Sequence, residues 1–216
     1  MKKITIILSI VLIIGVFGYM RFFSNEPMVS PLSSLSHPTG VAATITPVQQ
    51  QTMTSIFVPY WSFTTKKIDT KDLDIIIYFG ISADENGIDK TDAGYTKLSQ
   101  FNKLLPAQTE TLLTVRMIDS EFNSKLLEDK KLQEKIILES IALAKEHNFS
   151  GIVLDFEINA LAFDSVIKNI SSLYIRYSKE VKANNLTFSV TLYGDTFYRA
   201  RPYDVEEIVK HADHIY

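Results

Sequence analysis

Cysteine is missing from all 216 residues of the sequence, and this absence excludes several kinds of chemistry together. Without thiols the chain has no disulfides, no thiolate metal site, no cysteine nucleophile and no acylated lipoprotein cysteine. The four histidines are scattered, and none has the close spacing to another histidine or a glutamate that a helix-borne zinc site needs. The sequence therefore predicts no metal centre.

An excess of positive charge is also absent. The 22 basic and 25 acidic side chains are mixed along the chain and give a formal net charge of -3. Nucleic acids are bound through concentrated positive surfaces, so we expect no nucleic-acid partner. Glycine is scarce, with eight residues, and no glycine-rich phosphate loop follows any predicted strand.

The beginning of the chain differs from the rest. Lys2 and Lys3 precede an apolar run over residues 4–20 that Arg21 closes, which is the pattern of a membrane-inserting export segment. The run lies at the short end of the spanning range and lacks a small-x-small cleavage site. These features favour an uncleaved membrane anchor over residues 1–23, with a cleaved signal as the alternative. A buried core helix is disfavoured because the run is apolar on all sides.

Residues 24–54 predict a disordered linker. They hold four of the seven prolines among Ser, Thr and Gln, without any apolar period. The positive flank before the anchor predicts that the following domain lies outside the cytoplasm. We therefore expect a single-pass protein of the cell membrane with an extracytoplasmic C-terminal domain, or a secreted protein if the N-terminus is cleaved.

Residues 55–216 alternate between strand-like and helix-like segments, which is typical of a parallel sheet wrapped by helices. The predicted strands cover residues 56–60, 73–79, 111–116, 151–157, 186–192 and 213–216. One long amphipathic helix is expected over residues 121–147, another follows the fourth strand, and a third covers residues 203–212.

This count of elements predicts the fold class. A (β/α)8 TIM barrel takes about 250 residues, so the region holds about five units and the start of a sixth strand. The sequence predicts an α/β fold of this kind, a partial barrel of about strands 1–6. The alternative is a complete open α/β sheet with six strands, which the length allows.

Two carboxylates lie near the end of the predicted fourth strand. Side chains alternate along a strand, so Val153, Asp155 and Glu157 share one side and the apolar residues between them face the helices. In a barrel the first side faces the interior, and the C-terminal ends of the strands carry the chemistry. Two neighbouring, partly buried carboxylates raise each other's proton affinity, so one can serve as a general acid. The alternative is a pair of strand-end carboxylates that only make caps or salt bridges.

The segment Ser-Gly-Ile-Val-Leu-Asp-Phe-Glu at residues 150–157 resembles the fourth-strand motif D-G-x-D-x-D-x-E of glycoside hydrolase family 18, the chitinase-like barrels. Gly151, Asp155 and Glu157 match in register, whereas Ser150 and Val153 replace the first two aspartates. Pro-Tyr-Trp at 59–61 and Ile-Tyr-Phe at 77–79 are similar to the aromatic clusters of the first two strands. Among bacterial members the chain is most similar to cell-surface and spore-type enzymes.

The resemblance implies hydrolysis of β-1,4 bonds in polymers that contain N-acetylglucosamine, chitin or peptidoglycan, by a substrate-assisted retaining mechanism. Glu157 would be the general acid, Asp155 would hold the acetamide of the sugar, and no cofactor is implied. Two departures support alternatives: Val153 removes one partner of Asp155, and Arg116 could pair with either carboxylate and lower its pKa. A catalytically inactive carbohydrate-binding barrel is one alternative, and a surface scaffold without a glycan site is another.

Aromatic side chains at the barrel mouth are candidates for stacking on sugar rings. Trp61 and Tyr193 are preferred because each follows a predicted strand, and Tyr60 and Tyr78 are further candidates. Asp195 closes the fifth strand together with Tyr193 and is a candidate substrate contact. We expect a glycan as the partner, a membrane contact through residues 4–20, and a monomer.

Overall fold

A curled parallel sheet organises the folded part of the chain. The computed structural model describes residues 53–62, 69–105, 110–196 and 198–216. Within them the strands pair side by side in the order β1 (Ser55–Pro59), β2 (Ile75–Asp84), β4 (Glu110–Met117), β5 (Gly151–Phe156), β6 (Thr187–Val190) and β7 (His214–Ile215), each parallel to its neighbour. A short β3 (Gly87–Ile88) pairs antiparallel with the end of β2. The sheet curls until the rings of Phe57 and Tyr216 lie 5.2 Å apart between centroids.

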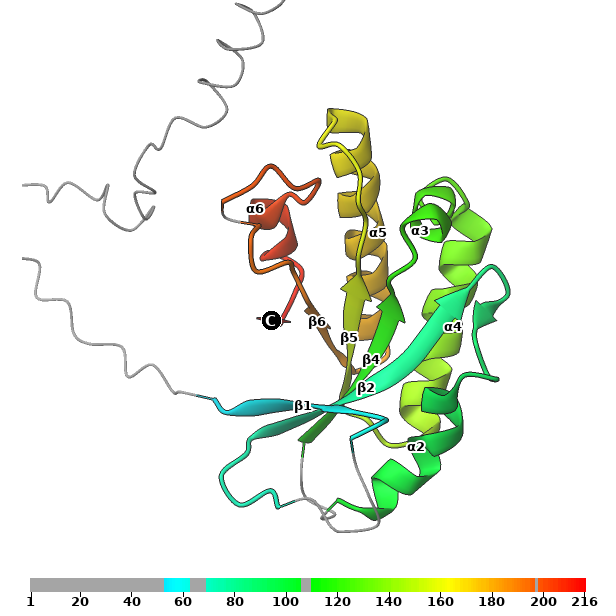
Figure 1. The fold of residues 1–216 in the computed structure, drawn as a ribbon, viewed down its shortest axis with the longest axis vertical. Helices are drawn as coiled ribbons and strands as arrows, with labels where there is room; N and C mark the ends of the chain where they lie inside the picture. Colours follow the sequence, from blue (N-terminus) through cyan, green and yellow to red (C-terminus); the bar gives the residue numbers. More distant parts are fainter. Residues whose placement is uncertain (1–52, 63–68, 106–109, 197) are drawn as a thin grey trace, which may run out of the picture. The chain divides into compact units, whose positions relative to one another are not determined.

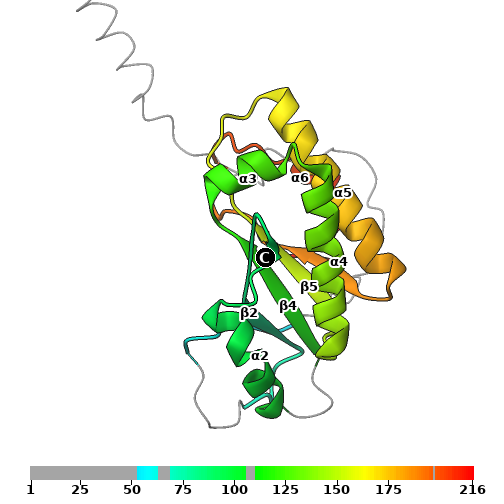
Figure 2. The ribbon, with the colours of Figure 1, turned by 90° about the vertical axis from the view of Figure 1, so that its right-hand side faces the viewer.

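Helices cover the outer face of this sheet, as Figures 1 and 2 show. The helices are α2 (Ala93–Lys103), α3 (Ser120–Leu126), α4 (Lys130–Glu146), α5 (Asp164–Ala183) and α6 (Val205–Ile208). This arrangement confirms the predicted α/β class and the partial barrel. The predicted anchor at 1–23 and linker at 24–54 lie outside the described residues, and none of the described helices is long and apolar enough to span a bilayer.

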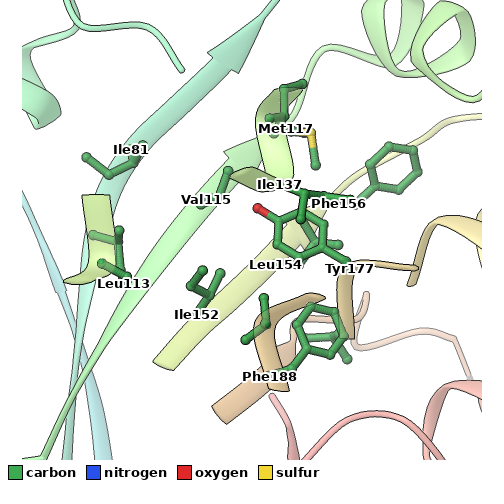
Figure 3. Close-up of a cluster of buried hydrophobic side chains, with 14 of the residues drawn as sticks. Ile81, Leu113, Val115, Met117, Ile137, Ile152, Leu154, Phe156, Tyr177 and Phe188 are labelled. Atoms are coloured by element: carbon green, nitrogen blue, oxygen red, sulfur yellow. The ribbon is translucent and has the colours of Figure 1, made fainter. Parts of the chain in front are cut away.

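Strand β5 lies in the middle of the sheet, and all six of its residues are buried. Its outward side chains Ile152, Leu154 and Phe156 join the core between sheet and helices, which Figure 3 shows together with Tyr177 and Phe188. On the inner side, Val153 packs in a smaller apolar cluster with Ile75, Ile77 and Leu112. The predicted division of this strand into two faces is therefore confirmed.

The helix expected over residues 121–147 is two helices. Asp129 interrupts it, because the carboxylate of Asp129 accepts hydrogen bonds from the backbone N–H groups of Lys131 and Leu132 and caps α4. Asp119 caps α3 in the same way. Differences elsewhere concern length and short elements: β2 continues to Asp84, β6 and α6 are shorter than expected, and β3 and α2 were not predicted.

Helix α2 begins in backbone contact with β2. The hydroxyl of Tyr78 donates a hydrogen bond to the Gly94 carbonyl. A Cβ atom placed on Gly94 would overlap the carbonyl oxygen of Gly80. Only glycine therefore fits at position 94, and the lack of a side chain there sets the distance between helix and strand.

Candidate active site

A cavity of about 220 Å³ opens at the C-terminal ends of β5 and β6. Its lining consists of Phe79, the segments 155–157 and 191–193, and Tyr203. In a barrel this end of the strands is the one at which chemistry is placed. The cavity thus contains both predicted carboxylates, Asp155 and Glu157.

Asp155 is the more buried of the two carboxylates, with 5% of its surface exposed. Its Oδ1 atom accepts a hydrogen bond of 2.5 Å from the hydroxyl of Thr191. Burial raises the pKa of Asp155, and the nearby charge of Glu157 acts in the same direction, whereas the Thr191 hydrogen bond and the charge of Arg116 oppose the rise. Asp155, the residue expected to hold the substrate, therefore has a raised pKa.

Glu157 is the first residue after β5, and its side chain is half-buried. Its Oε2 atom accepts a hydrogen bond of 3.2 Å from the hydroxyl of Tyr193. Its backbone N–H donates to the Met117 carbonyl at 2.8 Å, which extends the pairing with β4 by one residue. The carboxylate of Glu157 is thus directed toward the segment that follows β6.

Two buried side chains hold the backbone around Glu157. The amide nitrogen Nδ2 of Asn123 donates to the carbonyls of Met117 and Glu157, both at 2.6 Å. On the other side, the hydroxyl of Tyr203 donates to the Phe156 carbonyl at 2.9 Å and accepts from the Ile158 N–H at 3.3 Å. We call Asn123 and Tyr203 the backbone clamp. It provides partners for the carbonyls of Phe156 and Glu157 and the N–H of Ile158, and it adds a second hydrogen bond to the Met117 carbonyl.

The sequence reasoning missed the backbone clamp. A signal existed for Asn123, which lies three and four residues before Leu126 and Leu127 and therefore on the apolar face of its helix. A polar side chain on such a face needs a buried partner. Tyr203 carried no comparable signal, because its partners lie more than 40 residues earlier in the chain.

Arg116 does not pair with either carboxylate. Its guanidinium lies over the ring of Phe79, with 4.9 Å between Cζ and the ring centroid. Among the described residues, no ion pair joins it to Asp155 or Glu157. The expected ion pair is therefore absent. The charge of Arg116 still acts to lower the pKa of Asp155, but burial outweighs it and the pKa is raised on balance.

Three of the four predicted aromatic contacts, Tyr60, Trp61 and Tyr193, lie at or next to the cavity. Tyr193 lines the cavity. Trp61 is 58% exposed, and its ring lies 6.1 Å from that of Phe79, which is part of the cavity wall. Tyr60 is half-buried and packs edge-on against Trp61. The aromatic rings of Trp61 and Tyr60 thus continue from the cavity wall.

Tyr78 does not lie at the barrel mouth. It is fully buried in the core beneath the helices, and its ring packs against the ring of Phe101 in a tilted contact. Neighbouring residues in a strand point to opposite faces, so Ile77 and Phe79 face inward while Tyr78 faces the helices. The prediction of Tyr78 as a substrate contact is wrong for this reason.

Both carboxylate oxygens of Asp195 are bound by Arg201, at 2.9 and 2.7 Å. This pairing lowers the pKa of Asp195. The guanidinium of Arg201 also lies over the ring of Tyr193, 4.4 Å from its centroid. Asp195 therefore braces the loop that carries Tyr193, and its carboxylate is already engaged by Arg201.

A larger hollow, of about 620 Å³, lies beside α3 and the β2–β3 turn. Its acidic residues include Asp119 and Asp129, but these carboxylates are bound to backbone N–H groups as helix caps. The described residues contain no group of three acidic, histidine or cysteine side chains that could hold a metal ion. The smaller cavity at the strand ends is therefore the better candidate site.

The family model of the glycosyl hydrolases family 18 matches residues 53–216. No curated protein matches the chain. Among solved structures, the chain is similar to a class V chitinase from Nicotiana tobaccum, with a TM-score of 0.67 and 16% identity over 76% of this chain and 51% of that one.

Two other solved structures give the same result. A Group IV chitinase from Ostrinia furnacalis in complex with allosamidin has a TM-score of 0.64 and 18% identity, covering 76% of this chain and 49% of that one. A chitinase from Cycas revoluta in complex with (GlcNAc)3 has a TM-score of 0.63 and 18% identity, covering 76% and 54%. The chain spans about half the length of these structures. At such identities the likeness concerns the fold.

Proposed function

Because the chain belongs to the glycosyl hydrolases of family 18, we propose that it hydrolyses β-1,4 bonds in polymers that contain N-acetylglucosamine, chitin or peptidoglycan. The observation that carries this proposal is the placement of Glu157. The clamped backbone presents its carboxyl group to a cavity whose inner wall holds Asp155. Glycosidic cleavage needs one positioned acid beside a second carboxylate.

The proposed reaction assigns a separate task to each carboxylate. Glu157 gives its proton to the leaving glycosidic oxygen, while the carbonyl oxygen of the substrate's own acetamide forms the new bond to the anomeric carbon. Asp155 accepts a hydrogen bond from the acetamide N–H and stabilises the positive charge on the ring that forms. Water then attacks the same carbon and returns a proton to Glu157, so the configuration is retained.

Complexes of structurally similar chitinases with oligosaccharides support a glycan as the partner. The chitinase from Cycas revoluta is in complex with (GlcNAc)3, and the tobacco enzyme, as a mutant, is in complex with NAG4. In the present chain, Trp61 and Tyr193 offer rings at the site that are suited to stacking on sugars. We propose that they bind the sugars on either side of the cleaved bond.

The first residues of the chain support a location of the proposed activity outside the cytoplasm. Lys2, Lys3 and the apolar run at 4–20 support an anchored protein with its catalytic domain outside the cytoplasm, and the linker at 24–54 would separate that domain from the anchor. Protease treatment of intact cells tests this topology, since a cytoplasmic domain would remain protected.

A second candidate function is carbohydrate binding without hydrolysis. Val153 supports it, because this residue replaces an aspartate of the family motif and lies in an apolar cluster with Ile75, Ile77 and Leu112. A valine can neither share a proton with Asp155 nor accept a hydrogen bond from it. Turnover would then be slow or absent while the sugar contacts remain.

The variant Glu157→Gln separates these functions in the full-length protein. With N-acetylchitotetraose and with purified peptidoglycan strands as substrates, we expect hydrolysis to fall by about 10²–10⁴-fold or more. Binding measured by calorimetry should be retained. Glu121→Gln is the matched control, because this glutamate lies exposed on α3 and pairs with Lys125, away from the cavity.

Each pattern of results identifies one function. Binding by the wild type without any hydrolysis would favour the inactive barrel. Hydrolysis that survives in Glu157→Gln would refute the role of Glu157. If the wild type neither binds nor hydrolyses either glycan, the remaining interpretation is a scaffold.

A further inference from the structure

Asp155 lacks a carboxylate partner on its own strand. The side chain two residues earlier on the same face is Val153, which is fully buried among aliphatic residues. Asp155 is itself buried and needs a polar partner. Within the described chain, the hydrogen bond that its carboxylate accepts comes from the neighbouring segment, from the Thr191 hydroxyl.

The geometry of Thr191 is fixed independently of this bond. Its backbone N–H donates to the Leu154 carbonyl at 3.1 Å, which ties the end of β6 to β5 directly beside Asp155. Thr191 also lines the cavity. The hydroxyl therefore approaches Asp155 from the β6 side, opposite to Arg116 on β4, which pairs in register with Asp155.

We propose that Thr191 is the positioning residue for Asp155, and that its hydroxyl replaces the partner that Val153 cannot provide. Thr191 binds Oδ1, and no side chain of the described residues donates to Oδ2. The second oxygen remains available to accept the N–H of an acetamide. This last step rests on the proposed function, whereas the contact between Thr191 and Asp155 does not.

A hydroxyl partner differs from a carboxylate partner in one physical respect. Threonine does not titrate, so Asp155 gains and loses a proton of its own instead of sharing one within a coupled pair. The charged or titratable groups that act on Asp155 are Glu157 next to its own strand, Arg116 on β4, Tyr193 after β6 and Tyr174 on α5. Against this background the Thr191 hydroxyl favours the charged form of Asp155.

The test compares Thr191→Val with Thr191→Ser in the full chain. Valine keeps the shape and removes the hydroxyl, whereas serine keeps the hydroxyl. The carboxyl carbon of Asp155, followed by ¹³C NMR as pH is varied, should titrate at higher pH in Thr191→Val and as in the wild type in Thr191→Ser. Thr187→Val is the control, since this hydroxyl lies at the other end of β6 and contacts Ser150.

Hydrolysis provides a second readout. A hydrogen bond to a charged group is worth about 1.5–3 kcal/mol, so kcat should fall about 10- to 100-fold in Thr191→Val, with a smaller change in KM. Thr191→Ser should retain kcat near the wild-type value. Should Thr191→Val not fold, the Thr191 hydroxyl proton of the wild type can be observed directly. Its resonance should be protected from solvent and should follow the Asp155 titration.

The outcomes separate this inference from the proposed function. If Thr191→Val leaves the titration of Asp155 unchanged, or if the wild-type hydroxyl proton exchanges freely, the inference is overturned even where the enzyme hydrolyses glycans. If the titration moves as expected but the wild type hydrolyses nothing, the contact stands and the proposed function fails.

Discussion

The backbone clamp makes a quantitative prediction for Tyr203→Phe. This substitution removes one hydroxyl and changes little in shape, yet it leaves both the Phe156 carbonyl and the Ile158 N–H without their partner. Each unsatisfied buried group costs about 1–3 kcal/mol. For the two groups together we therefore expect the free energy of unfolding to fall by about 2–6 kcal/mol.

Tyr177→Phe is the matched comparison. Tyr177 is also a fully buried tyrosine, and its hydroxyl contacts the Ser140 hydroxyl at 2.7 Å. Ser140 keeps its own bond to the Ile137 carbonyl when the tyrosine hydroxyl is removed. Removal of the hydroxyl leaves no backbone group without a partner, and Ser140 loses only the donor to its oxygen, so the cost should be about 1 kcal/mol.

Urea unfolding of the three proteins, followed by far-ultraviolet circular dichroism, measures the difference. With an m-value of about 2 kcal/mol per molar, the middle of the usual range, the midpoint should fall by about 1–3 M for Tyr203→Phe. The fall for Tyr177→Phe should be less than half as large. In the hydrolysis assay only Tyr203→Phe should lower kcat, about tenfold or more, since the clamp flanks Glu157 on both sides.

Equal midpoints for the two variants would refute the reasoning about stability. Such a result would mean that water or a relaxed backbone satisfies both peptide groups. A loss of stability in Tyr203→Phe with unchanged kcat would show instead that the clamp supports the fold without positioning the acid.

Two further predictions concern the carboxylate and the aromatic wall. The folded-state pKa of Asp155 is raised by burial, so its contribution to stability is fully present below the unfolded pKa of about 3.9 and is lost as pH rises through the folded value. As the pH rises above about 4, the stability of Asp155→Asn relative to the wild type should therefore increase in thermal unfolding. A difference in stability that does not vary with pH would contradict this. Trp61→Ala should weaken N-acetylchitotetraose binding by about 1 kcal/mol, roughly fivefold in Kd, with stability unchanged within about 0.5 kcal/mol because the ring is exposed. Unchanged calorimetric affinity would remove Trp61 from the site.

Local periodicity predicted the parts of the fold that depend on neighbouring residues. The alternation in β5 gave the inner and outer faces, and with them the position of Asp155 at the cavity. The same rule could not assign Tyr78 to a face of the sheet. Strand β2 is apolar on both faces, so its sequence does not show which residues point inward. Asp129 is a residue type that caps helices, and it could have indicated the break between α3 and α4. The apolar period continues on both sides of Asp129, however, so the sequence reads as one helix.

The residues that complete the site come from distant parts of the chain. Thr191 lies 36 residues from Asp155, Asn123 lies 34 residues from Glu157, and Tyr203 lies 47 residues from Phe156. Their roles follow from hydrogen-bond partners that only the curled sheet brings together. A sequence shows the residue types, but the partners of a buried polar group depend on tertiary structure.

Position 94 shows how a residue can be required for a reason unrelated to chemistry. The carbonyl of Gly80 occupies the space that any side chain at Gly94 would need, while nothing lies within 4 Å of the corresponding point on Gly194. Gly194 neighbours the candidate site and Gly94 forms no part of the cavity lining. A library of random variants selected for a folded protein would thus accept changes at Gly194 and reject changes at Gly94. For these two glycines, tolerance to substitution follows the free space around Cβ rather than distance from the cavity.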